Sequence, residues 1–193
     1  MRGVTEMKVL VVYASKSGFT KGIAEFIAER LRGRGIQADA LEAGAARNTN
    51  DYDAFVIGSA IYMFHWAKEA KEFVSKNKEL LAVRPVWLFS SGPVGTKPTN
   101  AKGQDLLEVS GPSEIGELRE STKARDHRVF FGGLDGSRLK GTMGLVYKTM
   151  MRSQTVRSEM PEGDFRDWKA IEAWASGIAD ALEVKSPTPV QDG

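Results

Sequence analysis

An apolar run followed by a loop of small polar residues constrains the fold more than any other stretch of this sequence. Residues 9–13 are Val-Leu-Val-Val-Tyr, and the loop Ser15–Thr20 follows them after a single alanine. An apolar run without polar alternation is typical of a parallel strand that is buried on both faces. The stretch therefore predicts a central strand that leads through a short loop into a helix.

The loop Ser15–Thr20, called here the Ser15 loop, has the chemistry of an anion site. Backbone N–H groups in the first turn of a helix lack intrahelical acceptors and lie at the positive end of the helix dipole. Ser15, Ser17 and Thr20 add hydroxyl donors, and Gly18 permits a positive φ or a close backbone approach. The alternative interpretation is an ordinary strand-to-helix turn that a Ser or Thr side chain caps.

The rest of the chain alternates predicted strands and helices. We expect strands over residues 36–41, 54–58, 86–91 and 128–133, and helices over residues 19–32, 66–81, 113–122 and 164–182. Ser113 and Asp164 are the expected N-caps of the last two helices, with Ile115 and Leu118 facing inward from the first of them. The alternation predicts an α/β fold with a parallel sheet and helices on both faces.

The length of 193 residues suits one domain, over residues 1–184, with insertions near 96–126 and 136–160 and a disordered tail at 185–193. The segment from Thr96 to about Pro112 is polar and shows no periodic pattern. The sequence contains no cysteine, which excludes disulfides, thiolate nucleophiles and iron–sulfur clusters. Its two histidines are far apart, so no metal site is expected and redox chemistry requires an organic cofactor.

The charge balance and the hydropathy limit the partners and the location. A net charge of +2 is too small to indicate nucleic acid as a partner. No run of about 18 apolar residues occurs, and the first residues lack the apolar core of a signal peptide. We therefore expect a cytoplasmic protein, with contact to the inner face of the membrane as the alternative considered for its basic segment.

Three unusual loops follow carboxyl ends of predicted strands, beginning at Ser15, Ser59 and Ser90. In open α/β sheets, ligands bind outside these ends, so the three loops are expected to converge on one site. Together they offer an anion cradle, an aromatic wall of Tyr62, Phe64 and Trp66, and a backbone-rich wall at 91–95. A phosphate attached to a flat conjugated ring would match all three loops.

The Ser15 loop resembles the phosphate loop of the flavodoxin superfamily, Ser/Thr-x-Ser/Thr-Gly-x-Thr, at every defined position. The resemblance implies a doubly wound five-stranded parallel sheet in the order 2-1-3-4-5 that binds FMN non-covalently. It implies that the phosphate lies on the Ser15 loop and the ring lies between the loops at 59–65 and 90–95. The FMN-binding residues expected from it are Ser15, Lys16, Ser17, Gly18, Phe19, Thr20, Ser59, Ala60, Ile61, Tyr62, Met63, Phe64, Ser91, Gly92, Pro93, Val94 and Gly95.

Within that superfamily the chain is most similar to the bacterial protoporphyrinogen oxidases that pass electrons to a quinone. The similarity lies in residues 58–62, in the apolar and basic stretch 145–152, and in residues 163–168. The long polar segment from Thr96 to His127 departs from that branch. The resemblance implies an FMN oxidoreductase with a small-molecule substrate and a quinone or a redox protein as electron acceptor.

The basic stretch has two interpretations. Residues 136–158 contain five cations and no acidic residue, while Met143, Val146, Tyr147, Met150 and Met151 fall on one helical face. In one interpretation, a short helix docks on the core and its cations are solvated. In the other, the cations attract carboxylates of a substrate such as a porphyrinogen, or anionic lipid headgroups. The residues assigned to substrate or surface binding are Arg138, Lys140, Lys148 and Arg152.

Three functions follow from these features. The first is an FMN enzyme that dehydrogenates a porphyrinogen-like substrate, the second a one-electron carrier, and the third an interaction scaffold without cofactor. The flavin supplies the chemistry in the enzyme, and no catalytic side chain is assigned apart from His65 as a minor candidate for proton transfer. Against that role, His65 lies at a helix start, where solvent exposure is common. Asp164 and Asp167 are interpreted as helix-capping residues.

Overall fold

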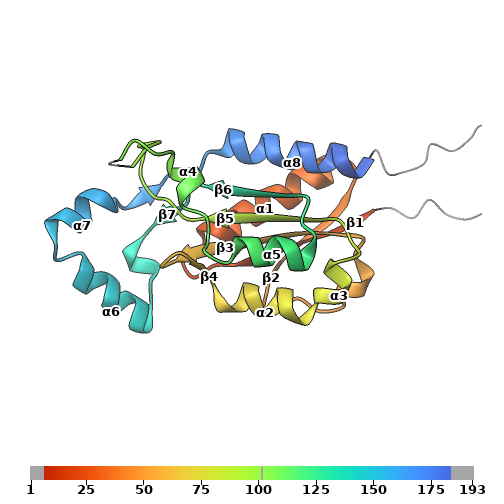
Figure 1. Ribbon diagram of the computed structural model, residues 1–193, viewed down its shortest axis with the longest axis horizontal. Helices are drawn as coiled ribbons and strands as arrows, with labels where there is room; N and C mark the ends of the chain where they lie inside the picture. The colour runs from red at the N-terminus through yellow and green to blue at the C-terminus, as the bar shows by residue number, and fades with distance from the viewer. Residues whose placement is uncertain (1–6, 101, 184–193) are drawn as a thin grey trace, which may run out of the picture.

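A parallel sheet of five strands forms the centre of the molecule (Figure 1). The computed structural model describes residues 7–100 and 102–183, so the predicted tail at 185–193 lies outside the described residues. The parallel strands are β1 (Lys8–Ala14), β2 (Gln37–Glu42), β3 (Ala54–Tyr62), β5 (Val86–Ser91) and β6 (Asp126–Phe130). Their order is β2-β1-β3-β5-β6, and the short β4 (His65–Trp66) pairs antiparallel with the end of β3. If only the five parallel strands are numbered, so that β5 and β6 become the fourth and fifth, the order is 2-1-3-4-5, which confirms the predicted fold.

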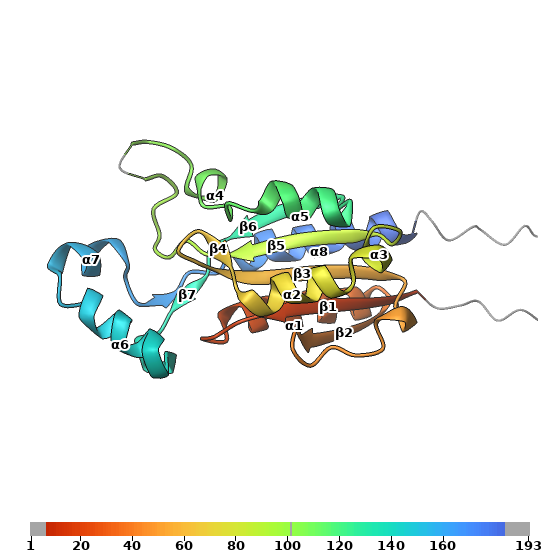
Figure 2. The same cartoon turned by 60° about the horizontal axis from the view of Figure 1, so that its bottom comes forward.

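Helices cover both faces of the sheet (Figures 1 and 2). One face carries α1 (Phe19–Gly33) and α8 (Trp168–Glu183), and the other carries α2 (Lys68–Lys76), α3 (Lys78–Leu81) and α5 (Ile115–Thr122). Along β1, Val9 and Val11 pack toward α1, whereas Leu10 and Val12 pack toward the opposite core cluster. The four side chains are fully buried, because a parallel strand with helices on both sides has no solvent-facing surface.

Several predicted elements have different bounds in the structure: β3 extends to Tyr62 instead of residue 58, and β6 ends at Phe130 instead of residue 133. The last strand begins at Asp126, two residues earlier than predicted, because its ladder with β5 starts where Asp126 pairs with Trp87. The predicted helix 66–81 is divided at Asn77, whose φ of −111° ends α2. The Asn77 side chain donates to the Phe73 carbonyl oxygen over 2.8 Å, an alternative to the helical ladder that asparagine readily offers.

The predicted N-caps Ser113 and Asp164 are wrong, whereas Asp167, also interpreted as a capping residue, is confirmed. Asp167, not Asp164, caps α8, since its Oδ1 accepts from the backbone N–H groups of Lys169 and Ala170 at 3.0 and 3.1 Å. Asp164 lies in the short strand β8 (Gly163–Asp164). No side chain caps α5, which begins after Glu114. The inward positions in α5 are confirmed, because Leu118 is buried and Ile115 packs against the same core cluster.

The predicted insertion at 136–160 leaves the sheet and returns to it at one place. Its stem is the antiparallel pair of β7 (Gly133–Leu134) and β8, after which the chain forms η2 (Gly136–Arg138), α6 (Gly141–Met150) and α7 (Gln154–Glu159). The basic stretch thus forms two helices instead of one, with Ser153 Oγ accepting from Val156 N at the start of α7. Figures 1 and 2 show α6 and α7 beyond the carboxyl ends of the strands.

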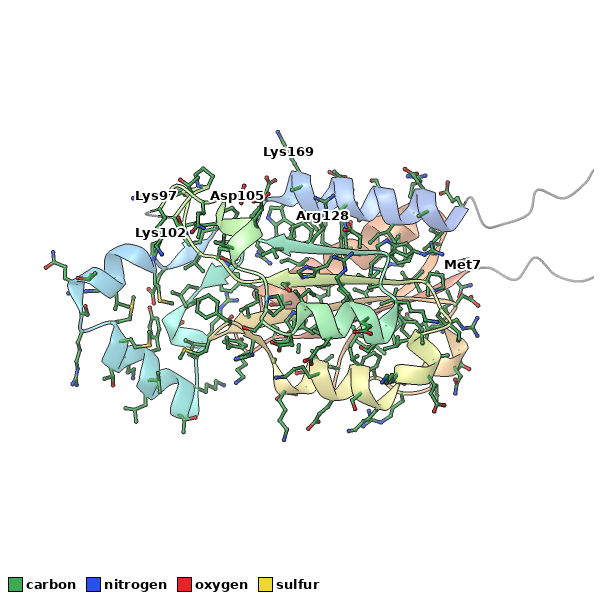
Figure 3. The ribbon with its side chains drawn as sticks, viewed as in Figure 1. Met7, Lys97, Lys102, Asp105, Arg128 and Lys169 are labelled. Carbon is green, nitrogen blue, oxygen red and sulfur yellow. The ribbon has the colours of Figure 1, made fainter. Side chains whose placement is uncertain are left out.

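The polar segment after β5 contains structure that its sequence pattern did not reveal. The helix α4 (Leu106–Val109) is capped by Asp105, whose Oδ1 accepts from Leu107 N at 2.8 Å. A single β-bridge joins Thr99 to Asp105. Figure 3 shows Lys97, Lys102 and Asp105 at the end of the molecule where the strands finish, opposite Met7 before β1.

Candidate functional site

The Ser15 loop joins β1 to α1 in a tight turn. Gly18 has a φ of 88° and precedes the first residue of α1. Its N–H donates to Ser15 Oγ over 3.0 Å, so the Ser15 hydroxyl holds the turn. A side chain at Gly18 would be strained at this φ, which explains why a glycine suits this position.

Two other hydroxyls of the loop face a cavity. Ser17 and Thr20 both line it, and Thr20 is only 1% exposed. Within the part of the chain that the structure describes, neither hydroxyl has a hydrogen-bond partner. Together with the free N–H groups at the start of α1, they form a set of donors that fits a phosphate group.

Tyr62, at the end of β3, connects the second loop to the first. Its hydroxyl accepts from the backbone N–H of Lys16 over 3.2 Å, and the Lys16 Nζ lies 5.0 Å from the centre of its ring. Burial raises the pKa of the Tyr62 phenol above its usual range, so the phenol keeps its proton at neutral pH. The loops at Ser15 and Ser59 therefore converge, as expected from the sheet order.

The turn between β3 and β4 exposes its apolar side chains. Met63 and Phe64 have φ values of 50° and 63°, and their exposed fractions are 85% and 65%. Met63 also lines the cavity, whereas Phe64 does not. Trp66, expected in the aromatic wall, is instead buried in the core at 2% exposure.

A buried polar network fixes the end of β5. Ser90 Oγ accepts from Trp66 Nε1 over 2.8 Å and lies 2.8 Å from His127 Nε2. Burial lowers the pKa of His127 to about 4, so its imidazole is neutral at pH 7. The sequence around His127 gives no sign of this network, because the other members of the network come from two other strands. Ser59 is similarly occupied, since its buried Oγ accepts from Ala67 N over 2.9 Å.

The third loop is held against the segment that follows β6. Gly92 N donates to Phe130 O over 3.2 Å, and Gly132 N donates to Pro93 O over 2.9 Å. A Cβ atom on Gly132 would lie 2.9 Å from Ser91 Oγ. The predicted strand 128–133 includes Gly132 and Gly133, whereas the observed strand ends at Phe130, so the sequence prediction missed their place beside the third loop.

These loops enclose one side of a cavity of about 250 Å³. Its walls include ten of the predicted FMN-binding residues: Ser17, Phe19, Thr20, Ala60, Ile61, Tyr62, Met63, Ser91, Gly92 and Val94. The other seven lie in the same three loops but do not line it: Ser15, Lys16, Gly18, Ser59, Phe64, Pro93 and Gly95. The structure therefore brings all three predicted loops to one place.

The insertion closes the opposite side of this cavity. It contributes apolar side chains and one phenol: Leu139, Val146, Tyr147, Met150, Met151, Val156 and Met160. Glu162 accepts from Tyr147 Oη over 2.5 Å and from Gly136 N over 3.0 Å. Burial, with the Glu162 carboxylate, raises the pKa of Tyr147 to about 12. The neutral phenol thus ties α6 to the stem of the insertion.

The predicted surface cations lie outside the cavity walls. Lys140, Lys148 and Arg152 are exposed, and Arg138 contacts the Ser15 loop, with its Nη1 3.3 Å from Ser17 O. His65 is exposed and pairs with Glu114 over 2.9 Å. Over residues 7–100 and 102–183, no cluster of side chains suits a metal ion, and no helix is long and apolar enough to cross a membrane.

The sequence was compared with family models and with curated proteins. A family model described as a flavodoxin domain matches residues 10–160. Protoporphyrinogen IX dehydrogenase (quinone) from Escherichia coli strain K12 is 33% identical over 94 residues, which are 48% of this chain and 52% of that protein. The chain thus spans about half the length of the curated relatives it matches.

Solved structures agree on the fold. A flavodoxin from the domain Archaea has a TM-score of 0.55 at 14% identity, covering 92% of this chain and 99% of that chain. Flavodoxin 2 from Bacillus cereus has a TM-score of 0.54 at 20% identity, with the same two coverages. Rubredoxin oxygen:oxidoreductase from Desulfovibrio gigas has a TM-score of 0.58 at 15% identity, covering 95% of this chain and 38% of that chain.

The family and the site agree with each other. The family match covers the Ser15 loop, both other loops and the insertion at 136–160. The hydroxyls of Ser17 and Thr20, which have no partner among the described residues, and the apolar cavity beside them fit a phosphate joined to a flat ring. The chain belongs to the flavodoxin domain family, and its cofactor is FMN, as the sequence predicted.

Proposed function

We propose that this protein is an FMN-dependent oxidoreductase that dehydrogenates a porphyrinogen-like substrate with several carboxylates and passes the electrons to a quinone. The observation that carries the proposal is the cavity shared by the three loops and the insertion. An electron carrier needs only the three loops, which hold the cofactor. In this protein α6 and α7 extend the cavity, and their apolar wall offers a surface for a second flat molecule beside the cofactor.

The apolar wall suits a large ring. Met150, Met151 and Met160 supply flexible and polarisable side chains that adapt to a flat hydrophobic surface. The walls contain no Asp, Glu, His, Lys or Arg side chain among the described residues. In this proposal the protein therefore binds and orients the substrate and excludes water from the cavity. Bound FMN would supply the oxidising chemistry.

The exposed cations suit the substrate's carboxylates. Lys140, Lys148 and Arg152 come from the same insertion as the apolar wall, and all three are exposed. An apolar ring held by the methionines would leave its carboxylates at the rim, where these cations attract them. The partial similarity to protoporphyrinogen IX dehydrogenase (quinone) supports the same substrate class.

The redox balance defines what the assay must contain. Each cycle removes two electrons and two protons from the porphyrinogen, and a quinone takes up two electrons and two protons to become a quinol. Rapid anaerobic mixing of the FMN-loaded protein with protoporphyrinogen is expected to bleach the flavin absorption, and added quinone is expected to restore it. A flavin that stays oxidised in the presence of excess protoporphyrinogen would remove the proposal.

Two variants of α6 sharpen this experiment. Met150 lines the cavity, whereas Leu145 is 69% exposed on the same helix and does not line it. Met150→Gln is expected to slow flavin reduction at low substrate concentration by about tenfold, equivalent to roughly 1.4 kcal/mol of lost apolar contact. Leu145→Gln is the matched control and should leave the rate within about twofold of the parent rate.

A one-electron carrier is the second candidate, favoured by the full-length fold similarity to flavodoxins. The charge balance of 27 basic to 25 acidic residues gives it little of the acidic surface that suits basic redox partners. A carrier would not be reduced by protoporphyrinogen, and its reduction by a chemical reductant would proceed in two one-electron steps well separated in potential. The same anaerobic experiment therefore distinguishes the two functions.

A further inference from the structure

Arg138 is the basic side chain of the insertion that contacts the Ser15 loop. Its Nη1 donates to Ser17 O over 3.3 Å, and a Cβ atom built on Gly18 would lie 3.6 Å from the same Nη1. The guanidinium carbon lies 5.4 Å from the centre of the Phe19 ring. The cation therefore lies directly beside the residues that open α1, where the dipole and the free N–H groups favour an anion.

The position of Arg138 is fixed from within the insertion. Its Nε pairs with Asp135 Oδ2 over 2.8 Å, and Asp135 Oδ1 also accepts from Ser137 N over 3.0 Å at the start of η2. A guanidinium has five N–H donors, and these contacts use only Nε and one hydrogen of Nη1. Among the contacts with described residues, the second hydrogen of Nη1 and both hydrogens of Nη2 therefore remain available for a further acceptor.

Two other cations near the Ser15 loop, Arg166 and Lys16, make different contacts. Arg166 also lies against the Phe19 ring, at 5.2 Å, but it donates to both carboxylate oxygens of Asp164 and to Phe19 O. The Lys16 Nζ lies over the Tyr62 ring. The Arg138 side chain is 57% exposed, compared with 14% for Arg166, so it has room to approach a ligand.

We propose that Arg138 donates to the phosphate of bound FMN, so that the insertion supplies a cation to the Ser15 loop. This inference depends on the assignment of the FMN phosphate to that loop, and it moves Arg138 from the predicted substrate-binding set to the cofactor site. Binding of the phosphate then also holds the insertion at its stem, because Arg138 is fixed to Asp135. Cofactor binding and closure of the cavity are thereby coupled.

The test compares FMN with riboflavin, which has the same ring and no phosphate. Arg138→Gln is expected to raise the dissociation constant for FMN about tenfold, the loss of one charge-assisted hydrogen bond at an exposed position. Its dissociation constant for riboflavin should stay within about twofold of the parent value. Both constants are measured by quenching of flavin fluorescence in the full-length protein, with no substrate present.

The matched control is Arg157→Gln, which removes the same charge from an exposed position of α7, outside the set of cations assigned to the substrate. It should leave both constants unchanged, and Arg138→Lys should recover part of the FMN affinity. Equal weakening of FMN and riboflavin would mean that Arg138 only supports the cavity wall, and an unchanged FMN constant would mean that it does not contact the phosphate. Either result overturns the inference.

This test is independent of the proposed reaction. A protein that binds FMN through Arg138 but is not reduced by protoporphyrinogen would refute the proposed substrate and leave the role of Arg138 intact. A second readout tests the coupling directly. FMN should slow proteolytic cleavage of the insertion in the parent protein more than in Arg138→Gln when both are saturated with FMN, and equal protection would contradict the coupling.

Discussion

Replacement of Ser17 and Thr20 together by alanine is expected to weaken FMN binding by two to four orders of magnitude. Each hydroxyl that donates to a phosphate contributes roughly 1.5–3 kcal/mol, and about 1.4 kcal/mol corresponds to a tenfold change in affinity. Both hydroxyls line the cavity, and within the described residues neither has a protein partner to lose. The measurement is the dissociation constant for FMN and for riboflavin, in the double variant and in its parent.

The stability of the apoprotein should change little in this double variant, because no hydrogen bond of the described structure is broken. Ser75→Ala is the matched control, since Ser75 is exposed on α2 and does not line the cavity. It should leave FMN affinity unchanged. If the double variant bound FMN as tightly as its parent, the phosphate would lie outside the Ser15 loop and the cofactor assignment to that loop would be wrong.

The second large effect concerns the core beneath the loops. Gly58 in β3 pairs with Phe89 in β5, and a Cβ atom on Gly58 would lie 1.9 Å from the Phe89 ring. Phe89 is fully buried and packs against Phe130 and Trp174, so its ring has little space to move. Gly58→Ala is expected to lower the free energy of unfolding by about 3 kcal/mol, the upper range for overpacking. Urea unfolding of the two apoproteins measures the difference.

The matched control makes the same chemical change where space is open. Gly177 lies within α8, and a Cβ atom there would have no neighbour within 4 Å. Gly177→Ala should stabilise the protein by up to about 1 kcal/mol, because alanine is the better helix former. Phe89→Leu combined with Gly58→Ala should recover part of the loss. Two glycine variants of equal stability would show that the ring of Phe89 does not depend on Gly58.

Much of the fold follows from local sequence pattern. The uninterrupted apolar run at 9–13 and the small-residue Ser15 loop are each contained in one short stretch, and the parallel sheet with helices on both faces follows from the alternation of strands and helices. The same logic brought the three loops together, because the carboxyl ends of parallel strands lie at one edge. The order of the strands is implied by the resemblance to the flavodoxin superfamily. These features needed no knowledge of distant contacts.

Other features depend on residues that meet only in the folded chain. His127 was overlooked because its network requires Ser90 from β5 and Trp66 from β4. The apolar stripe of the basic stretch was identified, but not its division into α6 and α7, nor the Tyr147 to Glu162 contact that closes it. A helical pattern of apolar residues predicts which face of a segment is buried, but it does not predict which part of the protein packs against that face.

Arg138 illustrates the same limit for charge. In the sequence it is one of five cations in a stretch without acidic residues, and all five appear equivalent. The pairing with Asp135 and the contact with Ser17, 121 residues away along the chain, separate it from the others. The sequence therefore predicts a basic segment, whereas the role of each cation depends on its three-dimensional position.

Titration of the purified apoprotein with FMN tests the central claim most directly. The account predicts saturable binding of one FMN per chain, with a change in the visible flavin spectrum and an increase in melting temperature that grows with FMN concentration, because a ligand bound only by the folded state must stabilise it. Riboflavin should bind more weakly than FMN, because it lacks the phosphate that the Ser15 loop would hold. A protein whose spectrum and melting temperature are unaffected by excess FMN would contradict the account.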